Sequence, residues 1–242
     1  MISPIFTTIV IVFLSILIYM KATTASFNTG DEKRIQEEAR ANSVRKKSLD
    51  DLNYITIPYD RLPFSLSSGS DTASAASSPN AEAASTAGDG GMGSGVHSIN
   101  KDEVLREDED SILKLAGSKI VNFTGISNTD LKAAYGAPNL ALLTEYDQNF
   151  TTLVKGLDSW GEHLIGRGNT ADARKVLEFA VECRTDLKST YLNLADIYAE
   201  GFEFDKIDHI MEVAGELNSL MKEPILRALK EKCDLNKYVG KK

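Results

Sequence analysis

The sequence has few of the residues on which disulfide-bonded and metal-dependent proteins rely. It holds two cysteines, Cys183 and Cys233, which stand fifty residues apart and outside any Cys-x-x-Cys pair. This pattern is typical of reduced thiols in a cytosolic protein, although a single bridge between the two stays open. The three histidines, His97, His163 and His209, have no second ligand at helical spacing. We therefore predict no metal site and no cofactor.

Positive charge is scarce as well, because the net charge is −8 and residues 99–242 carry 19 Lys and Arg against 25 Asp and Glu. Nucleic-acid binding needs a basic face, so no nucleic-acid partner is predicted. The acidic run at 107–110 is interpreted as a solvated helical face. Since the carboxylates form no recognisable catalytic pair, we predict that the chain is not an enzyme. An all-helical enzyme with a dispersed site is the least favoured alternative.

Charge of either sign is absent from residues 2–20, ISPIFTTIVIVFLSILIYM. As a helix, these nineteen residues would extend about 28 Å, close to the thickness of a bilayer core. No Lys or Arg precedes the run, whereas Lys21 and six further basic residues follow it within residues 33–47. We predict a transmembrane helix over 1–21, in a single-pass protein of the cell membrane with its N-terminus outside and its C-terminal domain cytoplasmic. A signal peptide cleaved near 23–25 is the alternative.

Three further segments separate this helix from the C-terminal part. Residues 22–51 are charged and predict a juxtamembrane helix over 31–48, either a spacer or a contact for anionic headgroups through Arg45, Lys46 and Lys47. Residues 52–64 should be extended, because Pro58 and Pro63 interrupt them, and form either a docking segment or a loose tail. Residues 65–98 are mostly Ser, Ala, Gly and Thr, which predicts a disordered linker that sets how far the folded domain can move.

The remaining residues, 99–242, have helical periodicity throughout, so the predicted fold class is all-α. A first helix should end near Gly117. Asn128 or Thr129 should cap a short helix, and a long helix should follow over about 138–166. The next corner needs a residue that tolerates positive φ, which Gly168 provides, and Asn169 or Thr170 can cap the helix after it.

Large and small side chains recur in this part of the chain at an interval of 34 residues. Five positions in residues 157–180 have a counterpart of similar size in residues 191–214. Leu157, Trp160, Gly161, Leu164 and Ala180 correspond to Tyr191, Leu194, Ala195, Tyr198 and Ala214. We predict that all of these residues pack between helices. Gly161 should let a second helix settle beside Trp160, because antiparallel helices approach closely only where one presents a small side chain. The glycines at 161, 166 and 168 follow a helix and lack Gly-Lys-Ser/Thr, so they do not predict a phosphate loop.

The interval and the order of side chains resemble the tetratricopeptide repeat (TPR) over about residues 154–219. Ala173 and Leu177 match two further positions of that family, whereas Ile207 and Met211 replace them in the second copy. Thr185 and Ser219 stand where the family has proline. The resemblance implies a TPR-like α-solenoid of antiparallel helical hairpins. The two ends of this solenoid would be covered by the helices before Val154 and by residues 223–233.

The resemblance also implies a concave groove lined by the first helix of each hairpin. Its ligand-facing positions are Lys155, Asp158, Ser159, Glu162, Ile165, Ser189, Leu192, Asn193, Asp196 and Ala199, with Glu200 adjoining them. From them we predict a partner groove formed by Asp158, Glu162, Asn193, Asp196 and Glu200. It should suit an extended peptide with basic or amide groups, unless these acids merely solvate a helical surface.

Together these features predict a membrane-anchored protein-interaction scaffold with a protein or peptide partner. The whole layout resembles membrane-tethered repeat proteins of low-GC Gram-positive bacteria, a likeness that implies no activity. The alternative is an autoinhibited module whose groove is occupied by its own residues 45–64.

Overall fold

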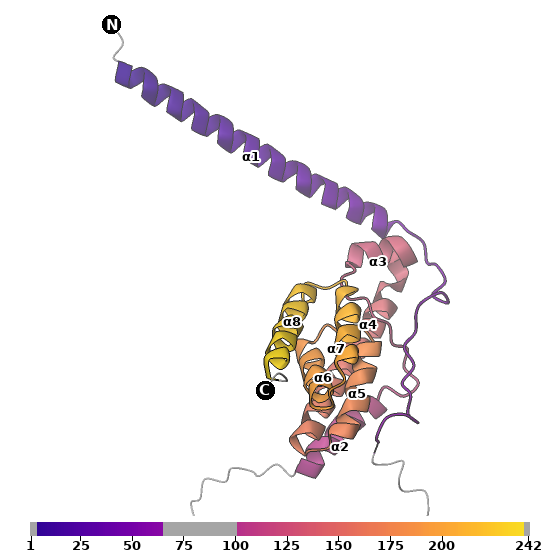
Figure 1. The fold of residues 1–242 in the computed structure, drawn as a ribbon. Helices are drawn as coiled ribbons and strands as arrows, with labels where there is room; N and C mark the ends of the chain where they lie inside the picture. Colours follow the sequence, from indigo (N-terminus) through magenta and orange to yellow (C-terminus); the bar gives the residue numbers. More distant parts are fainter. Residues whose placement is uncertain (1–3, 65–100, 240–242) are drawn as a thin grey trace, which may run out of the picture. The chain divides into compact units, whose positions relative to one another are not determined.

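The structure is a computed structural model that describes residues 4–64 and 101–239 (Figure 1). The predicted linker, residues 65–98, lies outside these ranges. Within them all regular elements are helical, which confirms the all-α class. The helices are α1 (Pro4–Asn42), α2 (Lys101–Leu113), α3 (Asn128–Tyr135), η2 (Ala137–Asn139), α4 (Leu140–Gly166), α5 (Thr170–Glu182), α6 (Lys188–Glu200), α7 (Phe204–Gly215) and α8 (Lys222–Val239).

The chain divides into two compact units, and each takes residues from both sides of the predicted linker. Unit 1 comprises Met1–Leu52 and Ile126–Glu145, and unit 2 comprises Asn53–Gly125 and Tyr146–Lys242. The division between the units therefore falls at three places, after Leu52, Gly125 and Glu145.

Unit 1 joins the end of α1 to α3. The Glu38 carboxylate accepts hydrogen bonds from Thr129 and from Lys132, which also forms an ion pair with it. Lys47 Nζ donates to the carbonyls of Ala133 and Ala134, at 3.2 and 2.8 Å, and so caps the last turn of α3.

Two sequence predictions for unit 1 need correction. The charged helix is not separate, because α1 continues through Gly30 without a break and ends at Asn42 rather than 48. The cap of α3 is Ser127, whose side chain accepts from the Asp130 amide, rather than Asn128 or Thr129. Ser127 is one residue earlier in the same Ser-Asn-Thr run, and all three are residues that favour this position.

No helix in the described ranges combines the length and the apolar character that a membrane crossing demands.

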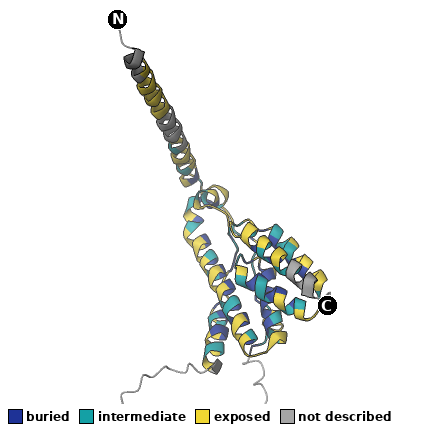
Figure 2. Ribbon diagram, turned by 60° about the vertical axis from the view of Figure 1, so that its left-hand side comes forward, coloured by how far each residue is buried: buried dark blue, intermediate teal, exposed yellow. Residues whose placement is uncertain are grey.

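Unit 2 is built on two helical hairpins, α4 with α5 and α6 with α7. All twelve residues predicted to pack between helices are buried: Leu157, Trp160, Gly161, Leu164, Ala173, Leu177, Ala180, Tyr191, Leu194, Ala195, Tyr198 and Ala214. Figure 2 colours such positions dark blue, on the sides of these helices that face one another. A Cβ added to Gly161 would lie 2.5 Å from Cδ2 of Leu177, so the helices meet where the small residue was predicted.

The two hairpin corners differ in the residue that adopts positive φ. At the first corner Gly168 has φ of 77°, and the Asn169 side chain accepts from the Asp172 amide. At the second corner, 34 residues later, Phe202 takes this backbone conformation with φ of 57°. A phenylalanine there carries steric strain that glycine avoids.

Both ends of the paired hairpins are covered by other parts of the chain. Ile225 and Leu229 of α8 are fully buried against the α6–α7 hairpin. At the other end, the core around Trp160 includes Ile112 of α2 and residues 57, 62 and 64 of the extended segment. The predicted docking segment thus lies on its own chain in this structure.

Candidate functional site

The five predicted groove residues lie on α4 and α6, and two of them hold neighbouring helices. Asp158 of α4 accepts hydrogen bonds from the hydroxyls of Ser189 and Thr190, at 2.5 and 2.6 Å. These two residues are in the first turn of α6, whose N-cap residue, Leu187, makes no side-chain bond. A carboxylate is favourable at a helix N-terminus, so Asp158 stabilises the start of α6 from the preceding hairpin.

Asp196 of α6 forms an ion pair with Lys232 of α8. Lys232 Nζ also approaches the Leu192 carbonyl at 3.4 Å, so this lysine ties α8 to two successive turns of α6. The Asp196 side chain is 54% exposed. Its pair with Lys232 is therefore a weak stabiliser that a competing cation can reach.

The other three predicted groove residues remain accessible. Glu162 and Glu200 are exposed, and Asn193 is half-buried. Their side chains make no hydrogen bond or ion pair with another residue in the described part of the chain. The geometry thus separates the predicted set into two residues that also bind neighbouring helices and three that do not.

The acidic run on α2 is not the solvated face that its sequence suggested. Asp108 and Glu109 are buried, with 9% and 5% exposure. The Asp108 carboxylate accepts from Ser159 Oγ at 2.8 Å and lies 2.5 Å from His163 Nδ1. A buried carboxylate needs hydrogen-bond donors to offset its lost hydration, and here α4 provides them. The contacts therefore join α2 to α4.

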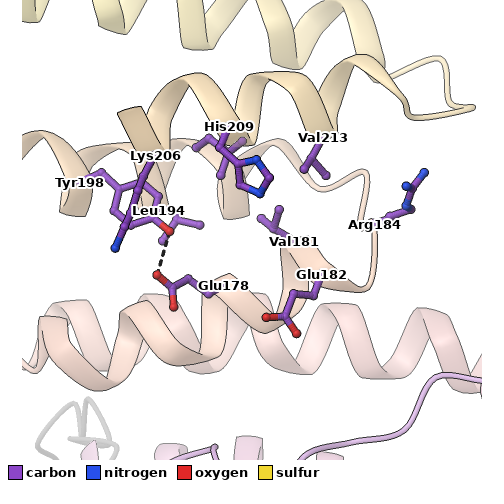
Figure 3. Close-up of a pocket in the computed structure, with 10 residues that line it drawn as sticks. Glu178, Val181, Glu182, Arg184, Leu194, Tyr198, Lys206, His209 and Val213 are labelled. Carbon is purple, nitrogen blue, oxygen red and sulfur yellow. Dashed lines mark hydrogen bonds between the residues drawn. The ribbon is translucent and has the colours of Figure 1, made fainter. Parts of the chain in front are cut away.

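A pocket of about 410 Å³ lies between α5, α6 and α7 (Figure 3). Its apolar lining comes from four residues, Val181, Leu194, Ile210 and Val213. The charged groups at its rim already have partners: Glu178 with Arg174 and Tyr198, Glu182 with Arg61, Arg184 with Glu216, and Lys206 with Glu203. The pocket therefore presents no unpaired carboxylate or guanidinium that would select a charged ligand.

The chemistry of Cys183 is that of a core residue. It caps the C-terminus of α5 with 5% exposure. Burial, with a smaller contribution from the Glu182 carboxylate, raises the pKa of its thiol to about 12. A thiol that stays protonated near neutral pH is a poor nucleophile. Nor do three or more His, Cys, Asp or Glu residues in the described ranges converge as metal ligands.

Sequence reasoning missed the polar connections that converge on Arg174. Its guanidinium binds Glu178 of its own helix at 2.8 Å and both carboxylate oxygens of Glu203, at 2.5 and 3.1 Å. It also lies over the Tyr198 ring at 5.1 Å. The spacing of Arg174 and Glu178 was the only sequence signal, since i,i+4 pairs face each other on a helix.

Comparison of the chain with protein-family models, with curated proteins and with solved structures found no match.

Proposed function

We propose that the chain is a membrane-anchored scaffold that recruits a protein or peptide partner through the first-helix faces of its repeats. The observation that carries this proposal is the division between the two sets of repeat positions. All twelve packing positions are buried, whereas none of the five groove positions is. Nested hairpins of this kind leave an extended surface on one side, which repeat proteins commonly use for binding. We propose in addition that the two hairpins are TPR-like repeats.

The partner surface that we propose consists of Glu162, Asn193 and Glu200, with Asp196 beside them. Two exposed carboxylates favour a partner with basic side chains. The amide of Asn193 can both donate to and accept from a peptide backbone. Asp158 is left out of this surface because its two oxygens already accept hydrogen bonds from α6.

The proposed anchor is the apolar first half of α1. Nine apolar residues between 11 and 20 are 48–71% exposed, all round the helix: Ile11, Val12, Phe13, Leu14, Ile16, Leu17, Ile18, Tyr19 and Met20. Contiguous apolar surface of this kind needs a cover, and a bilayer would cover every side of it. Ser15 Oγ donates to the Ile11 carbonyl at 2.8 Å, which satisfies the hydroxyl within the helix.

The same helix would set the spacing between the anchor and α3. From Met20 to Glu38, which binds α3, the helix rises about 27 Å at 1.5 Å per residue. Lys47 is engaged with the C-terminus of α3.

Proximity labelling in the native cell tests the proposal. The tethered wild type is compared with the triple variant Glu162→Ala, Asn193→Ala, Glu200→Ala. A matched control is Asp208→Ala, Glu212→Ala, which removes two exposed carboxylates from α7. We expect the triple variant to lose specific labelled neighbours that the wild type and the control share. Identical neighbours for all three forms would remove the groove from consideration.

The contacts of residues 45–64 bear on the autoinhibited alternative, in which these residues would occupy the groove. Residues 53–64 contact Trp160, Ile120 and Glu182, rather than the five groove residues. A partner that displaced this segment would therefore expose part of the core and leave the groove as it is. Arg45 and Lys47 contact residues of unit 1. Occupation of the groove by residues 45–64 thus has no support among these contacts.

A further inference from the structure

Residues 53–64, called the strap from here on, bury apolar side chains in the core of unit 2. Ile57, Leu62 and Phe64 have exposures of 6%, 4% and 5%. The Phe64 ring lies 4.9 Å from the ring of Trp160, which is fully buried. The largest apolar side chain of the strap thus covers the largest side chain of the repeat core.

Polar contacts fix the position of the strap. The Ile55 amide donates to the Ile120 carbonyl at 2.9 Å, a single bond of the kind that joins extended segments. Arg61 reaches Glu182 at 2.8 Å, but both side chains are more than half exposed, so this pair contributes little. The apolar residues therefore provide most of the affinity, and the backbone bond fixes the register.

Unit 1 contains a second contact between the same two parts of the chain. On one side are residues 38–47, called the unit 1 seat, and on the other are α3 and η2. The Ala137 amide donates to the Val44 carbonyl at 3.2 Å, and Asn139 Nδ2 donates to the Lys47 carbonyl at 2.8 Å. A Cβ on Gly136 would collide with the Arg45 backbone, so the two segments are in close contact.

We infer that residues 1–64 and 101–242 are two pieces of one fold, held together by the strap and the unit 1 seat and not by the peptide connection between them. Each compact unit contains residues of both pieces. Cutting the chain between 64 and 101 therefore leaves the proposed anchor bound to the repeats. Two contacts on one piece also reinforce each other, because the second forms within a complex that the first has already made. The inference holds whether or not residues 2–20 cross a membrane.

The test uses the full chain in detergent, with a recognition sequence for a site-specific protease placed between residues 75 and 90 and an affinity tag at the C-terminus. After complete cleavage, we expect the N-terminal piece to remain with the tagged piece through affinity capture and size-exclusion chromatography. Prompt separation of the two pieces would overturn the inference.

Variants measure the contribution of the strap. Phe64→Ala removes a buried aromatic side chain and should speed dissociation of the cut pieces by about 100-fold or more. Leu62→Ala provides a second, smaller truncation, and Thr56→Ala is the matched control, because Thr56 is exposed. Far-UV circular dichroism before cleavage shows whether each variant is folded, because Phe64 itself contacts Trp160 and its removal would change the tryptophan fluorescence. Equal dissociation rates for Phe64→Ala and Thr56→Ala would refute the role of the strap.

Discussion

Gly161→Ala tests the physical basis of the hairpin packing. The added methyl carbon would lie 2.5 Å from Cδ2 and 2.7 Å from Cγ of Leu177, a side chain with no exposure. Overpacking of a filled core costs about 1–3 kcal/mol. Alanine recovers about 1 kcal/mol over glycine within a helix. We expect a net loss of about 1 kcal/mol, which corresponds to roughly 2–4 °C in Tm for a domain of this size.

A double-mutant cycle separates the collision from the helix propensity. Leu177→Ala alone should cost about 2–5 kcal/mol, because it leaves a cavity. In that background the methyl group added by Gly161→Ala has room, so this substitution should stabilise the protein by up to about 1 kcal/mol. The sign of the Gly161 effect should thus reverse between backgrounds, with a coupling energy of about 1–3 kcal/mol.

Urea unfolding in detergent, followed by the fluorescence of the single tryptophan, provides the measurement. Trp160 is adjacent to Gly161 and fully buried, so its emission reports on this packing. Gly166→Ala is the matched control, because a Cβ at Gly166 meets nothing within 4 Å. Equal stabilisation by Gly161→Ala in both backgrounds would refute the close approach of α4 and α5.

Four further measurements address other contacts. Phe202→Gly should stabilise unit 2 by about 1 kcal/mol, because Phe202 is 79% exposed and has positive φ; a lower urea midpoint would contradict this. Asp158→Ala should cost about 1–3 kcal/mol, since Thr190 is buried and loses its acceptor, whereas Glu162→Ala should change the stability by less than about 0.5 kcal/mol. Cys183 should react with a thiol reagent at pH 8 more slowly than the half-buried Cys233, and should match it only after unfolding, because burial raises its pKa to about 12. The hydrogen bond from Arg174, followed by that from Lys206, lowers the pKa of Glu203 below 4.5. The contribution of Glu203 to stability is therefore present above pH 4.5 and is lost as the pH falls through the lowered pKa. Glu203→Gln should flatten the fall in stability that urea unfolding measures over this acid range.

The elements with helical periodicity could be predicted well. Helical periodicity predicts a long helix over about 138–166, and the structure has η2 at Ala137–Asn139 followed by α4 at Leu140–Gly166. Asn169 was one of two predicted caps, and its side chain accepts from the Asp172 amide. These features are local, because periodicity, caps and corners depend on residues a few positions apart.

The strap and the acidic run of α2 could not be placed in this way. Residues 57, 62 and 64 have no fixed period, and the face that they cover is formed by residues about a hundred positions later. Asp108 gave no sign of burial in sequence, since its partners, Ser159 and His163, lie more than fifty residues away. Sequence patterns indicate contacts between residues that are close in the sequence, whereas these contacts depend on the tertiary fold.

The acidic residues of the predicted groove serve two different purposes. Asp158 of α4 and Asp196 of α6 each bind the helix after next along the chain, through Ser189 and Thr190 of α6 in one case and Lys232 of α8 in the other. A carboxylate near a helix start or a lysine gains a partner without leaving the surface. Glu162 and Glu200 have no such neighbour, and their charge faces solvent. Their side chains, rather than the full acidic set, are therefore where a basic partner would gain most.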